Sequence, residues 1–508
     1  MLGLKRKAAD FWMQTDTETD HRNAWIIPIA SCLINAILFG VYRSYGIVLT
    51  VIIKTYSVSR SEATWFISLC MTVIHLTGPF SGLLNNHFTI RKITFFGCAL
   101  ATLGVGLCYF ATNVTQIIVF IGIIQGFGIG MTYVQIPAII NENFVKFRAT
   151  ANGIAMSGGT IGAFVLCPIT GYCLQNFTLD KCFLILSMVT LLSLPISFLL
   201  KTKKKKIDTQ KKQISDALKR NSVYLISVEK AEEKVPHLSN LETTTDSPIR
   251  RESVYYKSLD TFSKKSSDFV LYMERKISVC NSNAIETIKK LSQPSVRSTL
   301  QTTCFRVINI VANPFFLLIC ITHLAYFWGS LTYLMVIVDH SQDRGIKRDL
   351  AAQLITTFSA GDLFGRIGSG CFLDNKLVPV KYVAMIAITA IGCILKLVPL
   401  FDNINISMAL AASLGFISGV IVVLLNILFC KYIGTKEAHL AFGLSSFFCG
   451  LATIVRPMLV GYFRDAVNGS YDGLFNVLSI VAIITGCLWL LEPLLRRRQK
   501  QSNVPNQK

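Results

Sequence analysis

The sequence contains little charge: only 16% of its 508 residues are Asp, Glu, Lys or Arg, whereas an average soluble domain carries about 25%. Its 15 cysteines are scattered singly and form no CxxC pair, so neither a zinc site nor a disulfide framework is indicated. No catalytic constellation lies outside the apolar runs. The composition therefore predicts neither an enzyme nor a bound metal or cofactor.

The formal net charge of +21 is high enough to suggest nucleic acid, but the lysines and arginines lie between long apolar runs. That arrangement is typical of membrane topology and not of a nucleic-acid partner. Twelve runs reach the ~20 residues that a membrane-crossing helix needs. They lie near residues 24–52, 63–85, 92–112, 116–140, 149–173, 179–200, 313–338, 350–373, 378–400, 405–430, 439–463 and 474–495.

One hydrophilic segment divides the twelve runs six and six, which is the plan of two-half secondary transporters of the major facilitator type. We therefore predict an all-α membrane protein with twelve transmembrane helices in two six-helix halves. The expected parts are an N-terminal tail (1–23), a first half (24–200), a long basic loop (201–312), a second half (313–495) and a basic tail (496–508). The composition of the loop predicts disorder, and whether the loop is also regulatory stays open.

The distribution of basic residues predicts the orientation. With both termini inside, 17 Lys and Arg lie in the short inward loops and tails, 22 lie in residues 201–310, and 7 lie in the outward loops. Basic residues concentrate on the cytoplasmic side of membrane proteins, so both termini are expected to be cytoplasmic. The lysine run 203–206 can lie on anionic membrane lipid.

Four basic residues fall inside the predicted spans: Arg43, Arg366, Lys396 and Arg456. A charge at the centre of a span costs about 2.5–3.5 kcal/mol on insertion scales, so each one needs a partner or a function. Lys396 is close enough to the end of its span to snorkel to the interface. Asp362 precedes Arg366 by four residues, which places both side chains on one helix face, where they can pair.

Three buried arginines against one buried aspartate leave a positive cavity that an anion would neutralise. A small carboxylate suits arginine because it accepts two parallel, charge-assisted hydrogen bonds. Asp362 can take up a proton, and the loss of its charge would free Arg366 for the substrate. We therefore expect the binding of an organic anion and of a proton to be coupled.

The fifth span begins with a segment, residues 143–158, that resembles the second signature of the monocarboxylate transporter family, roughly YFxKRRxLAxGxAxAG. The matching positions are Phe144, Lys146, Arg148, Ala151, Gly153, Ala155 and Gly158. The family's first signature is matched only at Asp20, Ala24 and Trp25. Residues 361–368 are similar to the family's eighth-helix segment, which carries a proton-linked Asp and a substrate-linked Arg.

This resemblance implies roles for residues in the first half. Arg43 stands where proton-coupled members carry a lysine, and together with Arg366 it is expected to bind the substrate carboxylate. His75 aligns with a pocket-lining aromatic residue, as a second proton site or a specificity residue. Asn152 and Met156 are expected beside the same cavity.

We expect the gate on the cytoplasmic side to involve Arg91, Lys146 and Arg148, although ordinary positive-inside charges explain these residues equally well.

By resemblance, the protein is expected in the plasma membrane, and some family members need a single-span ancillary glycoprotein to reach it.

The function hypothesis is a secondary active transporter that moves a small, lactate- or pyruvate-like monocarboxylate with a proton by alternating access. One alternative is an uncoupled or sodium-coupled carrier of aromatic or larger amphiphilic carboxylates. Another is a non-transporting membrane sensor built on a transporter scaffold.

Overall fold

The structure is a computed structural model that describes residues 20–85, 88–200, 296–375, 377–466 and 470–502. All regular structure in these ranges is helical. Of the predicted basic loop, residues 201–295 lie outside the described residues, and α13 (Val296–Val311) is the described helix that follows them. The predicted tails lie largely outside the described residues as well.

The first half is built from helices that begin directly after a short 3-10 turn at Arg22–Trp25. Its α-helices are α2 (Ile26–Tyr56), α3 (Arg60–Leu76), α4 (Gly78–Leu84), α5 (Ile90–Leu107), α6 (Val114–Ile117), α7 (Gly126–Asn143), α8 (Arg148–Asn176), α9 (Leu179–Leu191) and α10 (Ser193–Ser197). A π-helical stretch, Ile118–Gln125, joins α6 to α7 into one continuous span.

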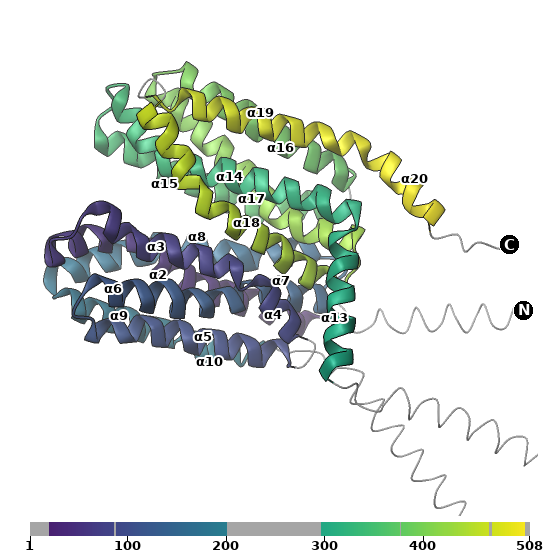
Figure 1. Ribbon diagram of the computed structural model, residues 1–508, viewed down its shortest axis with the longest axis horizontal. Helices are drawn as coiled ribbons and strands as arrows, with labels where there is room; N and C mark the ends of the chain where they lie inside the picture. The colour runs from purple at the N-terminus through teal and green to yellow at the C-terminus, as the bar shows by residue number, and fades with distance from the viewer. Residues whose placement is uncertain (1–19, 86–87, 201–295, 376, 467–469, 503–508) are drawn as a thin grey trace, which may run out of the picture. The chain divides into compact units, whose positions relative to one another are not determined.

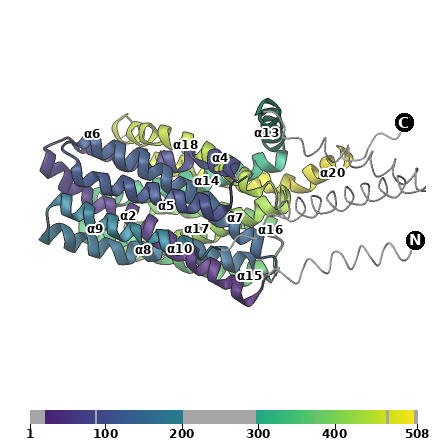
Figure 2. The same cartoon turned by 90° about the horizontal axis from the view of Figure 1, so that it is seen from below.

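The second half repeats this plan with longer uninterrupted helices. They are α14 (Pro314–Asp343), α15 (Arg348–Asp374), α16 (Val380–Leu397), α17 (Ile404–Tyr432), α18 (Ala438–Gly461), α19 (Asp472–Leu488) and α20 (Glu492–Ser502). Figure 1 shows the helices of the first half, purple to blue, and those of the second half, green to yellow, as two groups beside each other. Figure 2 shows that the long helices of both groups run roughly parallel.

The helices confirm the predicted all-α fold of twelve spans. Among the described residues, eleven helical stretches are long and apolar enough to cross a membrane. The twelfth is α15, which has 27 residues, but the charges of Asp362 and Arg366 lower its apolar character. The second span is broken between α3 and α4 just before Pro79, because proline removes a backbone donor and clashes with the preceding turn.

The first helix packs very closely against the fifth span, α8. A Cβ atom on Gly158 would lie 2.0 Å from the carbonyl oxygen of Cys32, and one on Gly162 would lie 1.9 Å from that of Ala36. Glycines at such positions let two helix backbones approach each other within a membrane. The glycine-rich segment of α8 is therefore a packing surface, and it fixes the α8 side chains that reach the centre of the protein.

The two halves meet at the end of the bundle where α2, α8 and α14 begin, which we call the loop end; the opposite end is called the far end. There α4 contacts α18, so that a Cβ on Gly78 would lie 2.3 Å from the Gly443 carbonyl oxygen. The start of α8 likewise contacts the end of α15, where a Cβ on Gly370 would lie 2.5 Å from Thr150. The bundle is closed between the halves at this end.

The close approach of α2 and α8 predicts that Gly162→Ala destabilises the protein, because the added methyl group meets the Ala36 backbone, which cannot move aside alone. Overpacking of this kind costs about 1–3 kcal/mol. The expected result is a lower midpoint of thermal unfolding in detergent. Gly171→Ala on the same helix is the control, since its Cβ meets nothing within 4 Å; equal midpoints for the two variants would contradict the prediction.

Candidate functional site: a charged cavity between the halves

A cavity of about 740 Å³ lies between the two halves and is lined by both. Its walls are mainly apolar and aromatic, with Phe39, Tyr42, Tyr133, Phe327 and Phe442 among the lining residues. Three arginines, Arg43, Arg366 and Arg456, also line it. This combination of apolar walls and a few polar groups is typical of small-molecule sites.

The predicted pair on α15 is present. Arg366 donates from Nε to Asp362 Oδ1 at 3.0 Å, and its Nη2 lies 2.8 Å from Oδ2, so the contact is bidentate. The Asp362 side chain is 2% exposed and that of Arg366 is 12% exposed. Arg366 lines the cavity and Asp362 lies behind it, shielded from the cavity by its own partner.

This ion pair also joins the two halves. Thr160 of α8 donates its hydroxyl to Asp362 Oδ2 at 2.8 Å, and Arg366 donates from Nη1 to the carbonyl oxygen of Met156 at 2.7 Å. Behind the pair, a Cβ on Gly419 of α17 would lie 2.3 Å from the Asp362 carbonyl oxygen, so only glycine permits this approach. The carboxylate and guanidinium are therefore both fully engaged, partly by the opposite half.

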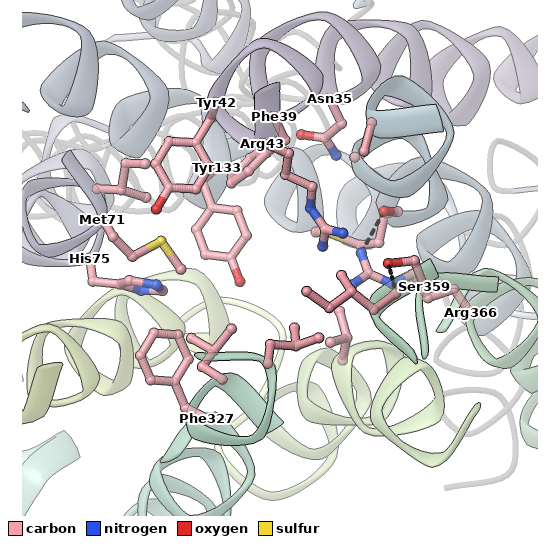
Figure 3. A pocket seen from close by; sticks show the side chains of 18 of the residues that line it. Asn35, Phe39, Tyr42, Arg43, Met71, His75, Tyr133, Phe327, Ser359 and Arg366 are labelled. Carbon is pink, nitrogen blue, oxygen red and sulfur yellow. Dashed lines mark hydrogen bonds between the residues drawn. The ribbon is translucent and has the colours of Figure 1, made fainter. Parts of the chain in front are cut away.

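Arg43 of α2 is half-buried in the same cavity. Within the described part of the chain, no hydrogen bond or ion pair satisfies its guanidinium, although the charges of Asp362 and Arg366 act on it. Figure 3 shows Arg43 extending toward the Arg366 side of the cavity. An unpaired arginine beside a paired one is the arrangement that a carboxylate ligand would complete.

Arg456 of α18 also lines the cavity. Its Nε and Nη1 atoms are buried and have no hydrogen-bond partner among the described residues. Its charge acts on Tyr42 and on His75. The sequence placed Arg456 among the charges inside spans but assigned it no role, and two of its guanidinium nitrogens are buried without a partner among the described residues.

His75 of α3 is 3% exposed, and neither ring nitrogen has a hydrogen-bond partner in the described chain. Its ring packs edge-on against Phe327, with the centroids 4.6 Å apart, and against Tyr133 at 5.9 Å. His75 thus lies in an aromatic wall of the cavity. His323 also lines the cavity, and its Nδ1 forms a hydrogen bond with the Ser445 hydroxyl at 2.8 Å.

Of the two α8 residues predicted beside the cavity, only one lines it. Met156 lines the cavity, whereas Asn152 does not and donates its amide to the Arg148 carbonyl oxygen at 3.0 Å. The physical reason is the closure at the loop end: a Cβ on the next residue, Gly153, would lie 2.2 Å from the Arg366 carbonyl oxygen. The cavity ends before it reaches Asn152.

The three residues expected at the gate lie at the loop end, and their hydrogen bonds and ring contacts among the described residues are with the first half, although the charge of Arg148 also acts on Cys430 of α17. Arg91 stacks over the Phe198 ring and Lys146 over Phe147. Arg148 donates to the Phe144 carbonyl oxygen at 3.1 Å.

Asp374, at the end of α15, makes hydrogen bonds between the halves at this end. Its carboxylate accepts from the backbone N–H groups of Ala149 and Thr150, each at 2.8 Å, and from the Thr150 hydroxyl at 2.6 Å. It thereby caps the N-terminus of α8, where unpaired N–H groups and the helix dipole favour an anion. Sequence analysis did not assign this role, although Asp374 follows the eighth predicted span.

Asp20 makes a similar cap within the first half. Its carboxylate accepts from the backbone N–H groups of Val145, Lys146 and Phe147 at 3.0–3.2 Å. Asp20, one of the three residues that match the first family signature, therefore holds the loop between α7 and α8 in place.

Lys396 and Glu492, near the ends of their spans, have local partners. Lys396 donates to Asn476 at 2.7 Å, and Glu492 accepts from Lys381 and from the Tyr432 hydroxyl, both at 3.3 Å. These residues lie outside the cavity lining. Among the described residues, no group of three or more His, Cys, Asp or Glu side chains is placed to hold a metal ion.

Comparison with known proteins decides the family. The profile described as the Major Facilitator Superfamily matches residues 31–457 and, in a second alignment, residues 315–508. The chain belongs to the major facilitator superfamily. It is therefore a multi-pass membrane transporter of that superfamily and not an enzyme.

Similar proteins within the superfamily are monocarboxylate transporters, as the signature residues predicted. Human monocarboxylate transporter 7 is 20% identical over 471 residues, which cover 92% of this chain and 86% of the relative. Rat monocarboxylate transporter 13 is 22% identical over 453 residues, covering 89% and 85%. Chicken monocarboxylate transporter 9 is 22% identical over 481 residues, covering 92% of each.

The cap on α8 predicts that Asp374→Ala weakens closure at the loop end, because three hydrogen bonds between the halves are lost. We expect a cysteine introduced at the cavity residue Thr356 to react more slowly with an impermeant maleimide added from the far end, since the halves then spend more time in the opposite conformation. The background lacks the exposed cysteines Cys304, Cys393 and Cys487 and the cavity-lining Cys167.

Asp180→Ala is the matched control, because this acidic residue lies in the first turn of α9, within one half. If the two aspartate variants are labelled at the same rate, Asp374 does not hold the halves closed.

Proposed function

We propose that this transporter carries an organic monocarboxylate together with a proton by alternating access between its two halves. The observation that carries the proposal is the Asp362–Arg366 pair at the cavity, joined to the opposite half through Thr160 and Met156. The monocarboxylate transporters among its relatives support the substrate class.

Arg366 and Arg43 are the proposed carboxylate ligands. In the unliganded cavity the Arg366 fork is occupied by Asp362, and Arg43 is unpaired within the described chain. A substrate carboxylate that enters would compete with Asp362 for Arg366. Protonation of Asp362 removes that competition, because a neutral carboxyl group pairs only weakly with a guanidinium.

Proton and substrate therefore favour each other. Without the proton, the substrate would place a second carboxylate beside Asp362, and like charges at short range repel. Without the substrate, a protonated Asp362 would leave Arg43 and Arg366 as uncompensated charges in a site of low dielectric. Loading both together leaves the net charge of the site unchanged, and the coupling is reciprocal by thermodynamic linkage.

The same residues connect binding to movement. Asp362 and Arg366 belong to the second half, and their hydrogen-bond partners Thr160 and Met156 belong to the first. Rearrangement of the pair changes contacts between the halves, which are the parts that move in alternating access. His75 is proposed as a specificity residue in the aromatic wall, and Arg91, Lys146 and Arg148 support the loop end.

A second candidate is a carrier of larger, amphiphilic or aromatic carboxylates, and the size of the cavity favours it. A lactate ion fills about four water-sized volumes of ~30 Å³ each, far less than the 740 Å³ of the cavity. The rings of Tyr42, Tyr133 and Phe327 would pack against an apolar substrate body.

We place both termini and the basic loop in the cytoplasm and the protein in the plasma membrane, on the distribution of basic residues and on the resemblance. On the same resemblance, an ancillary single-span glycoprotein is a proposed partner.

Vesicle transport tests the coupling. Labelled lactate, pyruvate and phenylpyruvate are offered with and without an inward proton gradient. Wild-type protein is expected to accumulate at least one of them above equilibrium only with the gradient. Asp362→Asn should abolish this accumulation while exchange persists, and Arg366→Ala should abolish both.

Glu492→Gln is the matched carboxyl-to-amide control, because Glu492 pairs with Lys381 outside the cavity. Gradient-driven accumulation that survives in Asp362→Asn would rule out this residue as the proton carrier. Uptake indifferent to the gradient in wild-type protein would instead favour an uncoupled carrier.

The unpaired state of Arg43 predicts a defect confined to substrate affinity. Arg43→Gln is expected to raise the half-saturating substrate concentration about tenfold, since one charge-assisted hydrogen bond is worth roughly that factor. The dependence on the proton gradient should remain, because Asp362 is intact. Concentration series in vesicles measure both quantities, and an unaltered half-saturating concentration would exclude Arg43 from the binding site.

A further inference from the structure

The positive charge in the cavity exceeds what one carboxylate can balance. Arg366 is neutralised by Asp362, which leaves Arg43 and Arg456 without an anionic partner among the described residues. A monocarboxylate compensates only one of these two positive charges. When Asp362 is protonated, Arg366 also depends on the substrate, so a monocarboxylate leaves at least one arginine without an anionic partner, which is costly in a medium of low dielectric.

Arg456 comes from a different helix than Arg366 and Arg43, although the charges of Arg43 and Arg456 both act on Tyr42. Arg366 belongs to α15, at the contact with α8, where it donates to Met156. Arg456 belongs to α18, which packs on α3: a Cβ on Gly450 would lie 2.9 Å from His75 Cβ, and Arg456 follows Gly450 by less than two turns. The charge of Arg456 acts on His75 and Tyr42.

Figure 3 shows which labelled residues lie on opposite sides of the cavity. In Figure 3, His75 and Met71 lie on one side of the cavity and Arg366 and Ser359 on the other, with Tyr133 between them. Arg366 therefore lies across the cavity from His75, and the charge of Arg456 acts on His75. Two buried polar atoms of the Arg456 guanidinium point to a ligand there, because buried donors are nearly always satisfied.

We propose that the preferred substrate is a dianion: an elongated dicarboxylate whose first carboxylate binds Arg366 and Arg43 and whose second carboxylate binds Arg456. This inference rests on the proposed function, since it assumes the carboxylate site on α15. It differs from that function in requiring a second anionic group at the other end of the substrate. The apolar stem between the two carboxylates lies along the aromatic side chains.

The test compares substrates that differ only in the second carboxylate. Uptake of labelled glutarate and suberate is measured in proteoliposomes at a fixed neutral pH, against pentanoate and octanoate respectively, with uptake by protein-free vesicles subtracted. Wild-type protein should show a half-saturating concentration about tenfold lower for at least one dicarboxylate than for the monocarboxylates. In Arg456→Gln this ratio should fall to about one.

Two further variants separate recognition from folding. Arg456→Lys keeps a positive charge and should retain part of the dicarboxylate preference. Lys396→Gln removes a cation from a span at a position bonded to Asn476 outside the cavity, and it should keep the full preference. Size-exclusion profiles in detergent confirm that all variants fold.

The outcomes are distinct. Equal half-saturating concentrations for both classes in wild-type protein, or an unchanged ratio in Arg456→Gln, would overturn the dianion inference and leave the monocarboxylate proposal intact. Absence of saturable uptake of either class, with no difference between wild-type protein and Arg366→Ala, would overturn the proposed function and this inference with it.

Discussion

The bidentate pair between Asp362 and Arg366 is the constraint around which the centre of the protein is arranged. Two opposite charges inside a membrane are tolerable only when they neutralise each other and their remaining hydrogen-bonding atoms are satisfied. Thr160 and Met156 of the opposite half supply those remaining contacts. The glycines of α8 and α17 bring the backbones close enough to allow it. Packing and charge balance therefore depend on the same few residues.

The conformation described here is closed at the loop end, and this closure determines which residues reach the cavity. Asp374 caps α8 across the interface, and the glycine contact between α4 and α18 shuts the other side of the same end. The cavity accordingly lies toward the far end. Its contents, three arginines and one aspartate in an aromatic enclosure, are suited to organic anions and poorly suited to neutral or cationic solutes.

The sequence predicted the features that depend on local pattern. Apolar runs located twelve spans, and the four-residue spacing of Asp362 and Arg366 predicted their pairing, since both follow from helix geometry. Contacts between distant segments left no such signal: nothing near Thr160 indicates that its hydroxyl meets Asp362. Asn152 matched the family motif, yet closure between α8 and α15 covers it. The importance of Arg456 emerged only once the packing showed that its guanidinium has no partner within the described chain.

Proton uptake on substrate binding tests the central claim most directly. Purified protein in weakly buffered detergent solution, with a pH indicator, is titrated with phenylpyruvate and with suberate. The account predicts uptake of about one proton for each substrate bound, because a proton on Asp362 releases Arg366 to the carboxylate, and no uptake by Asp362→Asn. Saturable binding without proton uptake in wild-type protein, or equal uptake in the variant, would contradict it.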